Sequence, residues 1–191
     1  GGPAMHLSNV ILIIGLITIG SIWLFCSQES GHAANHPLAQ YIEQFGEVDA
    51  NLYRGAQPDA EALRQLKQQG IKKIISFRTE EDINAQERTM VETLGMEFIV
   101  IPWLIYGSLD QTVYDRFFEA IQNKEIKPVF FHCKRGAERT GVMAAAYAMR
   151  YKNRPLEEAL AEAKHYAIKF FWWPFVKSKI EQCARWNTPS T

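Results

Sequence analysis

The sequence contains few cysteines and no excess charge of either sign. Cys26, Cys133 and Cys183 are the only cysteines among its 191 residues, too few for the disulfide framework that holds small secreted domains together. The 21 Lys and Arg side chains balance the 21 Asp and Glu side chains. This balance argues against a generally basic protein, so we expect no nucleic-acid partner. The hydrophobic fraction of 47% excludes intrinsic disorder and is sufficient for the core of one domain.

The first 53 residues contain almost no charged side chains. Glu29 is the only one before Glu43, and the first basic residue is Arg54. Residues 10–26 within this stretch read VILIIGLITIGSIWLFC, a nearly continuous apolar run of 17 positions. A helix of that length rises about 25 Å, slightly less than the ~30 Å hydrocarbon core of a bilayer.

We therefore predict that residues 5–34 are a signal peptide or a membrane anchor, containing an apolar helix that contacts the membrane through residues 10–26. A buried core helix is a third interpretation. The acidic residues that follow favour an exported or membrane-anchored domain on the extracytoplasmic or periplasmic face. Gly1–Ala4, ahead of Met5, are interpreted as an expression scar. The predicted functional domain is then residues 35–191.

The rest of the chain alternates strand and helix patterns. Strands are predicted at residues 51–54, 71–77, 97–101 and 128–132. Apolar residues at helical spacing predict helices near 60–69, 83–94 and 113–121, and further helices to the end, broken near 153–155 and 173–174. This order predicts an α/β fold with a central, mostly parallel sheet flanked by helices. No second domain is visible.

The segment HCKRGAERTG, residues 132–141, lies between the last predicted strand and a helical run. A glycine-containing loop at a helix N-terminus points several backbone N–H groups into one concavity and so binds anions. Cys133 at its start would have its thiolate stabilised by these donors. Arg139 can turn back and bind two phosphate oxygens. Gly136 permits the turn, and Thr140 is expected to hydrogen-bond the Cys133 sulfur.

This segment resembles the signature His-Cys-x-x-Gly-x-x-Arg-Thr-Gly of cysteine-dependent protein tyrosine and dual-specificity phosphatases. Residues 52–58 and 70–78 resemble the opening strands of compact bacterial and fungal enzymes of the dual-specificity type. The resemblance implies a dual-specificity phosphatase-like fold, a phosphocysteine intermediate on Cys133, a tuning role for His132, and no metal or cofactor. The predicted phosphate-binding residues are Lys134, Arg135, Gly136, Ala137, Glu138 and Arg139.

Several functions remain open at this point. The first is hydrolysis of phosphomonoesters in phosphotyrosine or phosphoproteins. The basic pair Lys134 and Arg135 is similar to that of relatives acting on phosphoinositides or inositol phosphates, so a phospholipid or an inositol phosphate is the second substrate class. A phosphate-binding module without catalysis is the third possibility. A thiol redox role, with Cys183 as the resolving partner of Cys133, is the fourth.

The general acid departs from the family pattern. The position where relatives carry an Asp falls near Ile105, which has no proton to donate. Asp110 is the nearest downstream carboxylate and is our predicted acid, although it also suits the first turn of a helix. Glu81 and Asp82 are the alternatives. An enzyme with no dedicated acid would still cleave substrates with good leaving groups, such as aryl phosphates or phosphoanhydrides.

Two further features need a structural interpretation. Arg54 and Arg78 end predicted strands, where we expect structural salt bridges, with a second phosphate contact as the alternative. The aromatic run at residues 170–175, FFWWPF, is expected to pack on the core, and a membrane interface is the alternative. Trp103 and Tyr106 are expected either to line the pocket or to pack.

Overall fold

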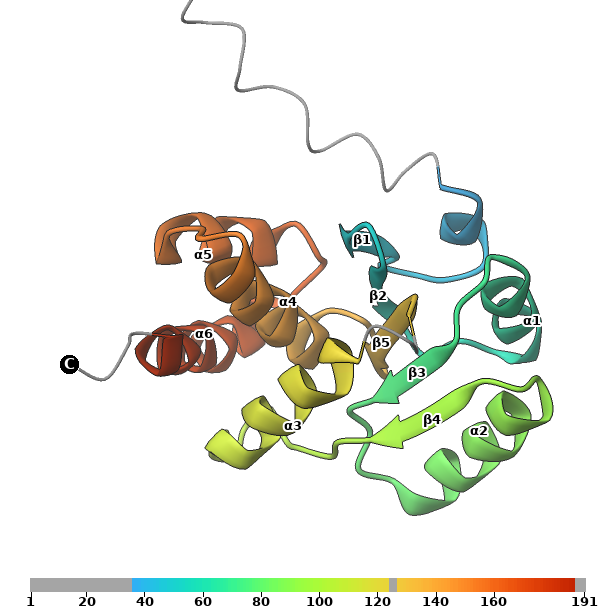
Figure 1. Cartoon of the computed structure of the whole chain (residues 1–191). Coiled ribbons are helices and arrows are strands. Elements are labelled where there is room, and N and C mark those ends of the chain that lie inside the picture. Colours follow the sequence, from blue (N-terminus) through green and yellow to red (C-terminus); the bar gives the residue numbers. More distant parts are fainter. Residues whose placement is uncertain (1–35, 124–126, 188–191) are drawn as a thin grey trace, which may run out of the picture. The chain divides into compact units, whose positions relative to one another are not determined.

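The computed structural model describes residues 36–123 and 127–187, which form a five-stranded sheet with helices on both faces (Figure 1). The strands are β1 (Gly46–Asp49), β2 (Leu52–Ala56), β3 (Lys73–Ser76), β4 (Glu97–Val100) and β5 (Val129–Cys133). Their order is β1-β2-β5-β3-β4. Only β1 is antiparallel to its neighbour, and the other pairs are parallel. The predicted α/β fold with a mostly parallel sheet is confirmed.

The edge strand β1 is the one strand that the sequence did not predict. Its residues Gly-Glu-Val-Asp show neither an apolar run nor a clear alternation. The strand forms because a short turn places it against β2, with Gly46 opposite Arg54 and Glu47 opposite Tyr53. An edge strand of this kind depends on the neighbouring strand more than on its own composition.

The helices agree with the predicted pattern. They are α1 (Ala60–Gln68), α2 (Glu81–Thr93), α3 (Gln111–Gln122), α4 (Glu138–Tyr151), α5 (Leu156–Lys164) and α6 (Trp173–Asn187), with short 3-10 helices η1 (Pro37–Gln40) and η3 (Phe170–Trp172). Asp59 caps α1 by accepting a hydrogen bond of 2.8 Å from the Ala62 N–H. The predicted breaks near residues 153–155 and 173–174 coincide with the start of α5 and of α6.

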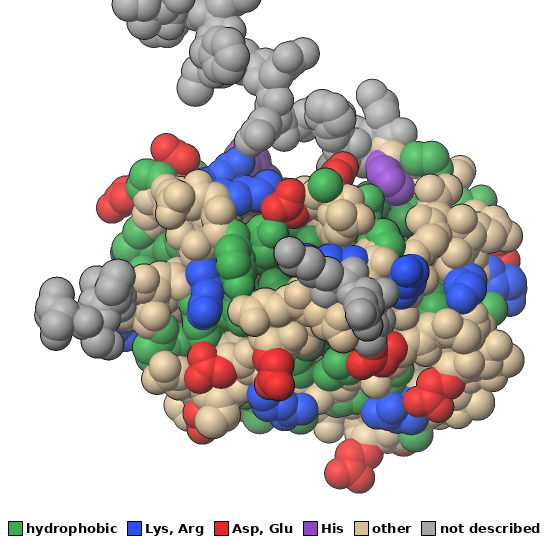
Figure 2. Space-filling view, in the orientation of Figure 1, with side chains coloured by type: hydrophobic (Ala, Val, Ile, Leu, Met, Phe, Trp, Pro, Cys, Tyr) green, Lys and Arg blue, Asp and Glu red, His purple; other side chains and the backbone are tan. Residues whose placement is uncertain are grey.

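The sheet separates two apolar cores because neighbouring strand residues point to opposite faces. Ile74 and Phe130 pack with the buried residues of η1, α1 and α2. Ile75 and Phe131 pack with α3, α4, α5 and α6 on the other face. Figure 1 shows the same division of the helices about the sheet. Acidic and basic side chains are interspersed over the surface shown in Figure 2.

Two sequence-based expectations have different outcomes. The predicted apolar helix and the whole segment 5–34 lie outside the described residues, and no helix within the described part is long and apolar enough to cross a membrane. The expected core packing of residues 170–175 is wrong for Phe170, Phe171 and Phe175, which are 88%, 49% and 41% exposed. Phe170 and Phe171 lie in the short helix η3 and Phe175 lies in α6, whereas Trp172 and Trp173 pack partly against the core.

Gly136, in the loop between β5 and α4, is the glycine on which the site most depends. It has a φ of +70°, and an added Cβ would lie 2.4 Å from the backbone of both Gly55 and Ala56 in β2. Gly70 has a similar φ of +84° but nothing within 4 Å of an added Cβ. An alanine would therefore adopt an unfavourable left-handed backbone conformation at both positions, but its Cβ would collide with neighbouring backbone only at position 136.

We expect Gly70→Ala to lower the free energy of unfolding by about 1–2 kcal/mol, the usual penalty of a left-handed alanine. We expect Gly136→Ala to lower it at least twice as much, because the loop must also move away from β2. Chemical denaturation of both variants measures the difference. Equal decreases in the free energy of unfolding of the two variants would contradict the close contact between the loop and β2.

Candidate active site

The predicted strand–loop–helix arrangement around Cys133 is present. All five residues of β5 are buried, and Cys133, its last residue, is only 2% exposed. The helix α4 follows after a short loop. Its N-cap residue Ala137 offers no side-chain acceptor, so the first-turn N–H groups remain available to an anion. The carboxyl end of a central parallel strand is also where α/β proteins bind ligands.

A pocket of about 310 Å³ includes the Cys133 side chain in its wall. The pocket is lined by Thr79, Glu80, Leu104, Ile105, Tyr106, Cys133, Lys134, Arg135, Glu138, Arg139 and Trp172. These residues come from the end of β5, from the loops after β3, β4 and β5, from the start of α4 and from η3. The structure thus brings together Cys133, Arg139 and three other predicted phosphate-binding side chains. Tyr106 lines the pocket as one of our two expectations had it, whereas Trp103 is buried.

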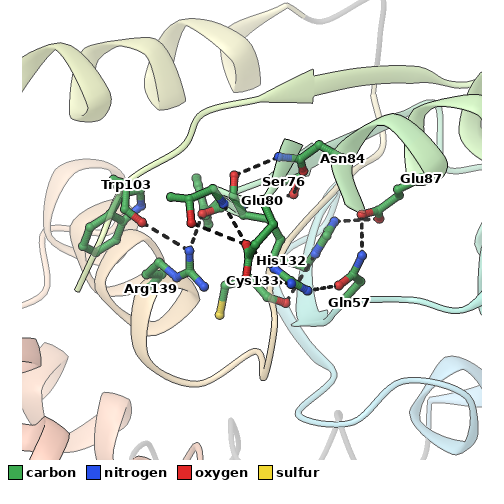
Figure 3. Close-up of polar contacts among 12 residues, drawn as sticks. Gln57, Ser76, Glu80, Asn84, Glu87, Trp103, His132, Cys133 and Arg139 are labelled. Atoms are coloured by element: carbon green, nitrogen blue, oxygen red, sulfur yellow. Dashed lines mark hydrogen bonds and ion pairs between the residues drawn. The ribbon is translucent and has the colours of Figure 1, made fainter. Parts of the chain in front are cut away.

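The Arg139 side chain is held in the pocket by backbone carbonyls. Its Nη1 donates to the carbonyl of Phe77 at 2.6 Å and to that of Trp103 at 3.2 Å (Figure 3). These two carbonyls come from the segments that follow β3 and β4. Since Nη1 is engaged in this way, the remaining donors Nε and Nη2 are the ones suited to phosphoryl oxygens.

His132 is fully buried and has a carboxylate partner that the sequence analysis missed. Its Nε2 lies 2.9 Å from Oε1 of Glu87 in α2, and its Nδ1 lies 3.4 Å from the Cys133 carbonyl oxygen. Gln57 donates to the other Glu87 oxygen at 2.9 Å, and Figure 3 shows this network beside Cys133. A signal existed in the sequence, because Glu87 precedes Val91 by four positions and so shares its buried helix face.

The cations and carboxylates at the pocket are largely paired with one another. Arg78 forms an ion pair with Glu80 at 2.9 Å and also donates to Gln57, which confirms the expected structural salt bridge. The hydrogen bonds from Arg78 lower the pKa of Glu80 to about 2. Arg135 similarly pairs with Glu138 at 2.6 Å. The two carboxyl groups in the pocket wall are therefore both bound to arginines.

Two further predicted site residues are Thr140, which is buried, and Asp110, which caps a helix. Thr140 is fully buried, and its hydroxyl has no hydrogen-bond partner among the described residues, so the expected bond to the Cys133 sulfur is not formed there. Asp110 caps α3 by accepting from the Thr112 N–H at 2.9 Å, a contact that lowers its pKa. It lies outside the pocket wall, whereas Ile105 lies in that wall. Their catalytic roles remain predictions.

Two other side chains singled out in the sequence have different environments. Arg54 is 1% exposed and donates to the Gly136 carbonyl at 2.6 Å, but no salt bridge joins it to a carboxylate in residues 36–123 and 127–187. The expected Arg54 salt bridge is therefore wrong, because a loop carbonyl takes the place of the carboxylate. Cys183 is a free thiol buried on α6, and this burial raises its pKa to about 12.

Comparisons with known proteins agree with this geometry. The chain is 27% identical over 118 residues to the dual specificity protein phosphatase TpbA of Pseudomonas aeruginosa. The aligned residues cover 62% of this chain and 52% of that protein. The chain thus spans about half the length of the curated relatives it matches.

Solved structures share the fold at low sequence identity. The crystal structure of P. aeruginosa TpbA has a TM-score of 0.63 at 22% identity, covering 73% of this chain and 84% of that one. A TpbA variant in complex with phosphotyrosine has a TM-score of 0.63 at 19% identity, covering 77% and 91%. The catalytic core of the PP-IP phosphatase SIW14 from S. cerevisiae has a TM-score of 0.62 at 19% identity, covering 76% of this chain and 93% of that one.

The family model described as "DSP-PTPase phosphatase fused to NAD+ Kinase" matches residues 39–172, well over half of the chain. The match includes every strand of the sheet, the signature loop and the helix that follows it. The chain therefore belongs to this family of dual-specificity-type protein tyrosine phosphatases.

Proposed function

We propose that the protein is a cysteine-dependent phosphatase that hydrolyses phosphomonoesters in phosphotyrosine and phosphoproteins. The observation that carries this proposal is the presence of Cys133 and Arg139 in one pocket at the N-terminus of α4. This arrangement combines a nucleophile with the donors that bind a phosphoryl group. The similar structure of a TpbA variant in complex with phosphotyrosine supports the same substrate class.

The reaction has two steps. The Cys133 thiolate attacks phosphorus, the P–S bond forms, and the bond to the leaving oxygen breaks. The Arg139 Nε and Nη2 groups and the loop amides bind the phosphoryl oxygens as negative charge redistributes. Water then attacks the phosphocysteine, releases inorganic phosphate and restores the thiolate. Both steps use the same oxyanion donors, so the substrate phosphate need not leave the loop.

The pocket favours substrates whose leaving group needs little protonation. Glu80, with a pKa of about 2, is ionised at neutral pH, and Glu138 is ion-paired with Arg135. The pocket wall also includes Tyr106 and Trp172, whose rings stack with centroids 6.3 Å apart. An aromatic wall beside an anion site suits an aryl phosphate, whose ring packs while its phosphate binds.

A second candidate substrate is an inositol pyrophosphate. The phosphoanhydride leaving group needs less protonation than an alcohol, which fits the ion-paired carboxylates of the pocket. The structural similarity to a PP-IP phosphatase supports this candidate. Lys134, an exposed residue in the pocket wall, adds a cation for the other phosphates. Turnover rates on phosphotyrosine peptides and on inositol pyrophosphates, measured side by side, distinguish the two.

The other functions considered are less consistent with the site. A phosphate-binding module has no use for a cysteine at the base of the anion site. A redox partnership needs a reactive second thiol, whereas burial raises the pKa of Cys183 to about 12. For the remaining chain, we propose that residues 5–34 target the protein to the membrane or across it, with the domain on the extracytoplasmic face. Cell fractionation with N-terminal sequencing tests this proposal.

We expect Cys133→Ser to lower the turnover of p-nitrophenyl phosphate by at least about 10³-fold, because an alcohol is a far weaker nucleophile than a thiolate at neutral pH. Cys183→Ser is the matched control and should retain activity within about threefold. Equal activity of wild type and Cys133→Ser would overturn the proposed mechanism. Trapping of a phosphocysteine by acid quench provides an independent measurement.

Because Asp110 caps α3 and lies outside the pocket wall, we infer that the enzyme has no dedicated general acid, the alternative that the sequence left open. We therefore expect Asp110→Asn, which keeps the cap of α3, to leave the turnover of p-nitrophenyl phosphate and of an alkyl phosphate nearly unchanged. Wild type and Asp110→Asn should both cleave the alkyl phosphate at least about 10²-fold more slowly than p-nitrophenyl phosphate, as expected for an enzyme without a positioned acid. A selective loss on the alkyl phosphate in Asp110→Asn would instead identify Asp110 as the general acid.

A further inference from the structure

Arg54 is a buried cation directly against the phosphate-binding loop. It lies on β2, which pairs with β5 so that Arg54 is opposite Phe131 and Ala56 is opposite Cys133. Its Nη2 donates to the Gly136 carbonyl at 2.6 Å, and its guanidinium stacks on the Tyr166 ring at 3.5 Å from the centroid. Its Nε is buried without a hydrogen-bond partner in the described residues.

This placement is energetically unfavourable for a residue with only a structural role. Removing a guanidinium from water costs several kcal/mol unless an anion compensates for the loss of solvation. No salt bridge to a carboxylate provides that compensation within the part of the chain that the structure describes. A Cβ at Gly141 would lie 3.9 Å from the Arg54 Nη2, so the cation also lies near the first turn of α4, where the helix dipole disfavours positive charge.

The active-site cysteine is one of the groups that can compensate the Arg54 charge, because it ends the strand that pairs with β2 and starts the loop that Arg54 contacts. Burial lowers the pKa of Arg54, while Tyr166, Cys133 and Glu162, in that order, act in the opposite direction. A coupling between two charges is reciprocal. A charged Cys133 that stabilises the Arg54 cation is therefore itself stabilised by that cation. The same holds for a phosphoryl group bound in the loop.

We propose that Arg54 is a positioning residue that acts as the fixed counter-charge of the Cys133 thiolate and holds the phosphate-binding loop through the Gly136 carbonyl. This proposal rests on the proposed function, in which Cys133 is the nucleophile. In a trans peptide the Ala137 N–H points opposite to the Gly136 carbonyl, so the bond to Arg54 also sets the direction of a loop amide. Tyr166 covers the guanidinium and keeps water from screening the charge.

Other charged or titratable groups also face this region. They are His132, Lys134, Arg135, Arg139, Glu80 and Glu138 around the pocket, and Tyr166 and Glu162 on the side of Arg54. Of the cations among them, Arg135 is paired with Glu138, Arg139 is engaged by carbonyls, and Lys134 is exposed. His132 lies 2.9 Å from the Glu87 carboxylate. Arg54 therefore differs from these groups in being both fully buried and without a carboxylate partner in the described residues.

The test measures alkylation of Cys133 by iodoacetamide from pH 5 to pH 9 in the full chain, with the modified residue identified by mass spectrometry. Arg54→Met should lower the alkylation rate at pH 6 about tenfold, because loss of the cation lets the thiol keep its proton to higher pH. The rate at pH 9 should approach that of wild type. The acid limb of the kcat/KM profile for p-nitrophenyl phosphate should move up by about one pH unit.

Arg54→Lys and Arg54→Gln separate the two parts of the proposal. Arg54→Lys keeps the charge and should restore the acid limb. Arg54→Gln removes the charge but keeps an amide donor for the buried carbonyl, so it supplies a second neutral variant if Arg54→Met folds poorly. It should show the same shift as Arg54→Met.

Lys73→Met is the matched control, since Lys73 is another buried cation that donates to a backbone carbonyl, that of Ala120 at 2.8 Å. It should leave the pH dependence of alkylation unchanged. A neutral Arg54 variant that is folded and lowers the rate equally at pH 6 and pH 9, or not at all, would overturn the proposal. Alkylation does not require turnover, so this result is distinguishable from failure of the proposed phosphatase activity.

Discussion

The site depends on the contact between the loop that follows β5 and the backbone of β2. Gly136 lies so close to Gly55 and Ala56 that a Cβ would not fit. The Gln57 N–H donates to the Lys134 carbonyl at 3.4 Å, and Arg54 donates to the Gly136 carbonyl at 2.6 Å. These contacts hold the loop from one side, and the amides at the start of α4 remain available to an anion. The Cys133 side chain lies at this junction.

A second constraint is the pairing of carboxylates around the pocket. Glu80 is bound by Arg78, Glu138 by Arg135, and Glu87 lies against His132. Each pair reduces the cost of placing a charge near the buried end of the sheet. The result is a pocket built to bind an anion, with carboxylates that are already engaged. This arrangement supports the proposal that the leaving group departs with little protonation.

Most of the fold could be predicted from the sequence because its elements have strong local patterns. Runs such as residues 71–77 and 128–132 contain Ile, Val and Phe, which favour buried strands. Helix boundaries had local signals, including Asp59 and the breaks near Pro155 and Pro174. The strand β1 and the exposed Phe170 were not predictable in this way. The strand β1 depends on pairing with β2, and the exposure of Phe170 depends on the turn of η3. Neither contact can be read from the residues of β1 or from Phe170 itself.

The sequence by itself determined the local arrangement of the site, since His132, Cys133, Gly136 and Arg139 lie in one strand–loop–helix segment whose spacing sets their placement. Only the tertiary structure decided the partners of these residues. Glu87 reaches His132 from α2, and Arg54 reaches the loop from β2, across 82 positions of the chain. It also decided that Asp110 caps a helix outside the pocket wall. Contacts between distant segments follow from sheet order and packing, which local spacing does not specify.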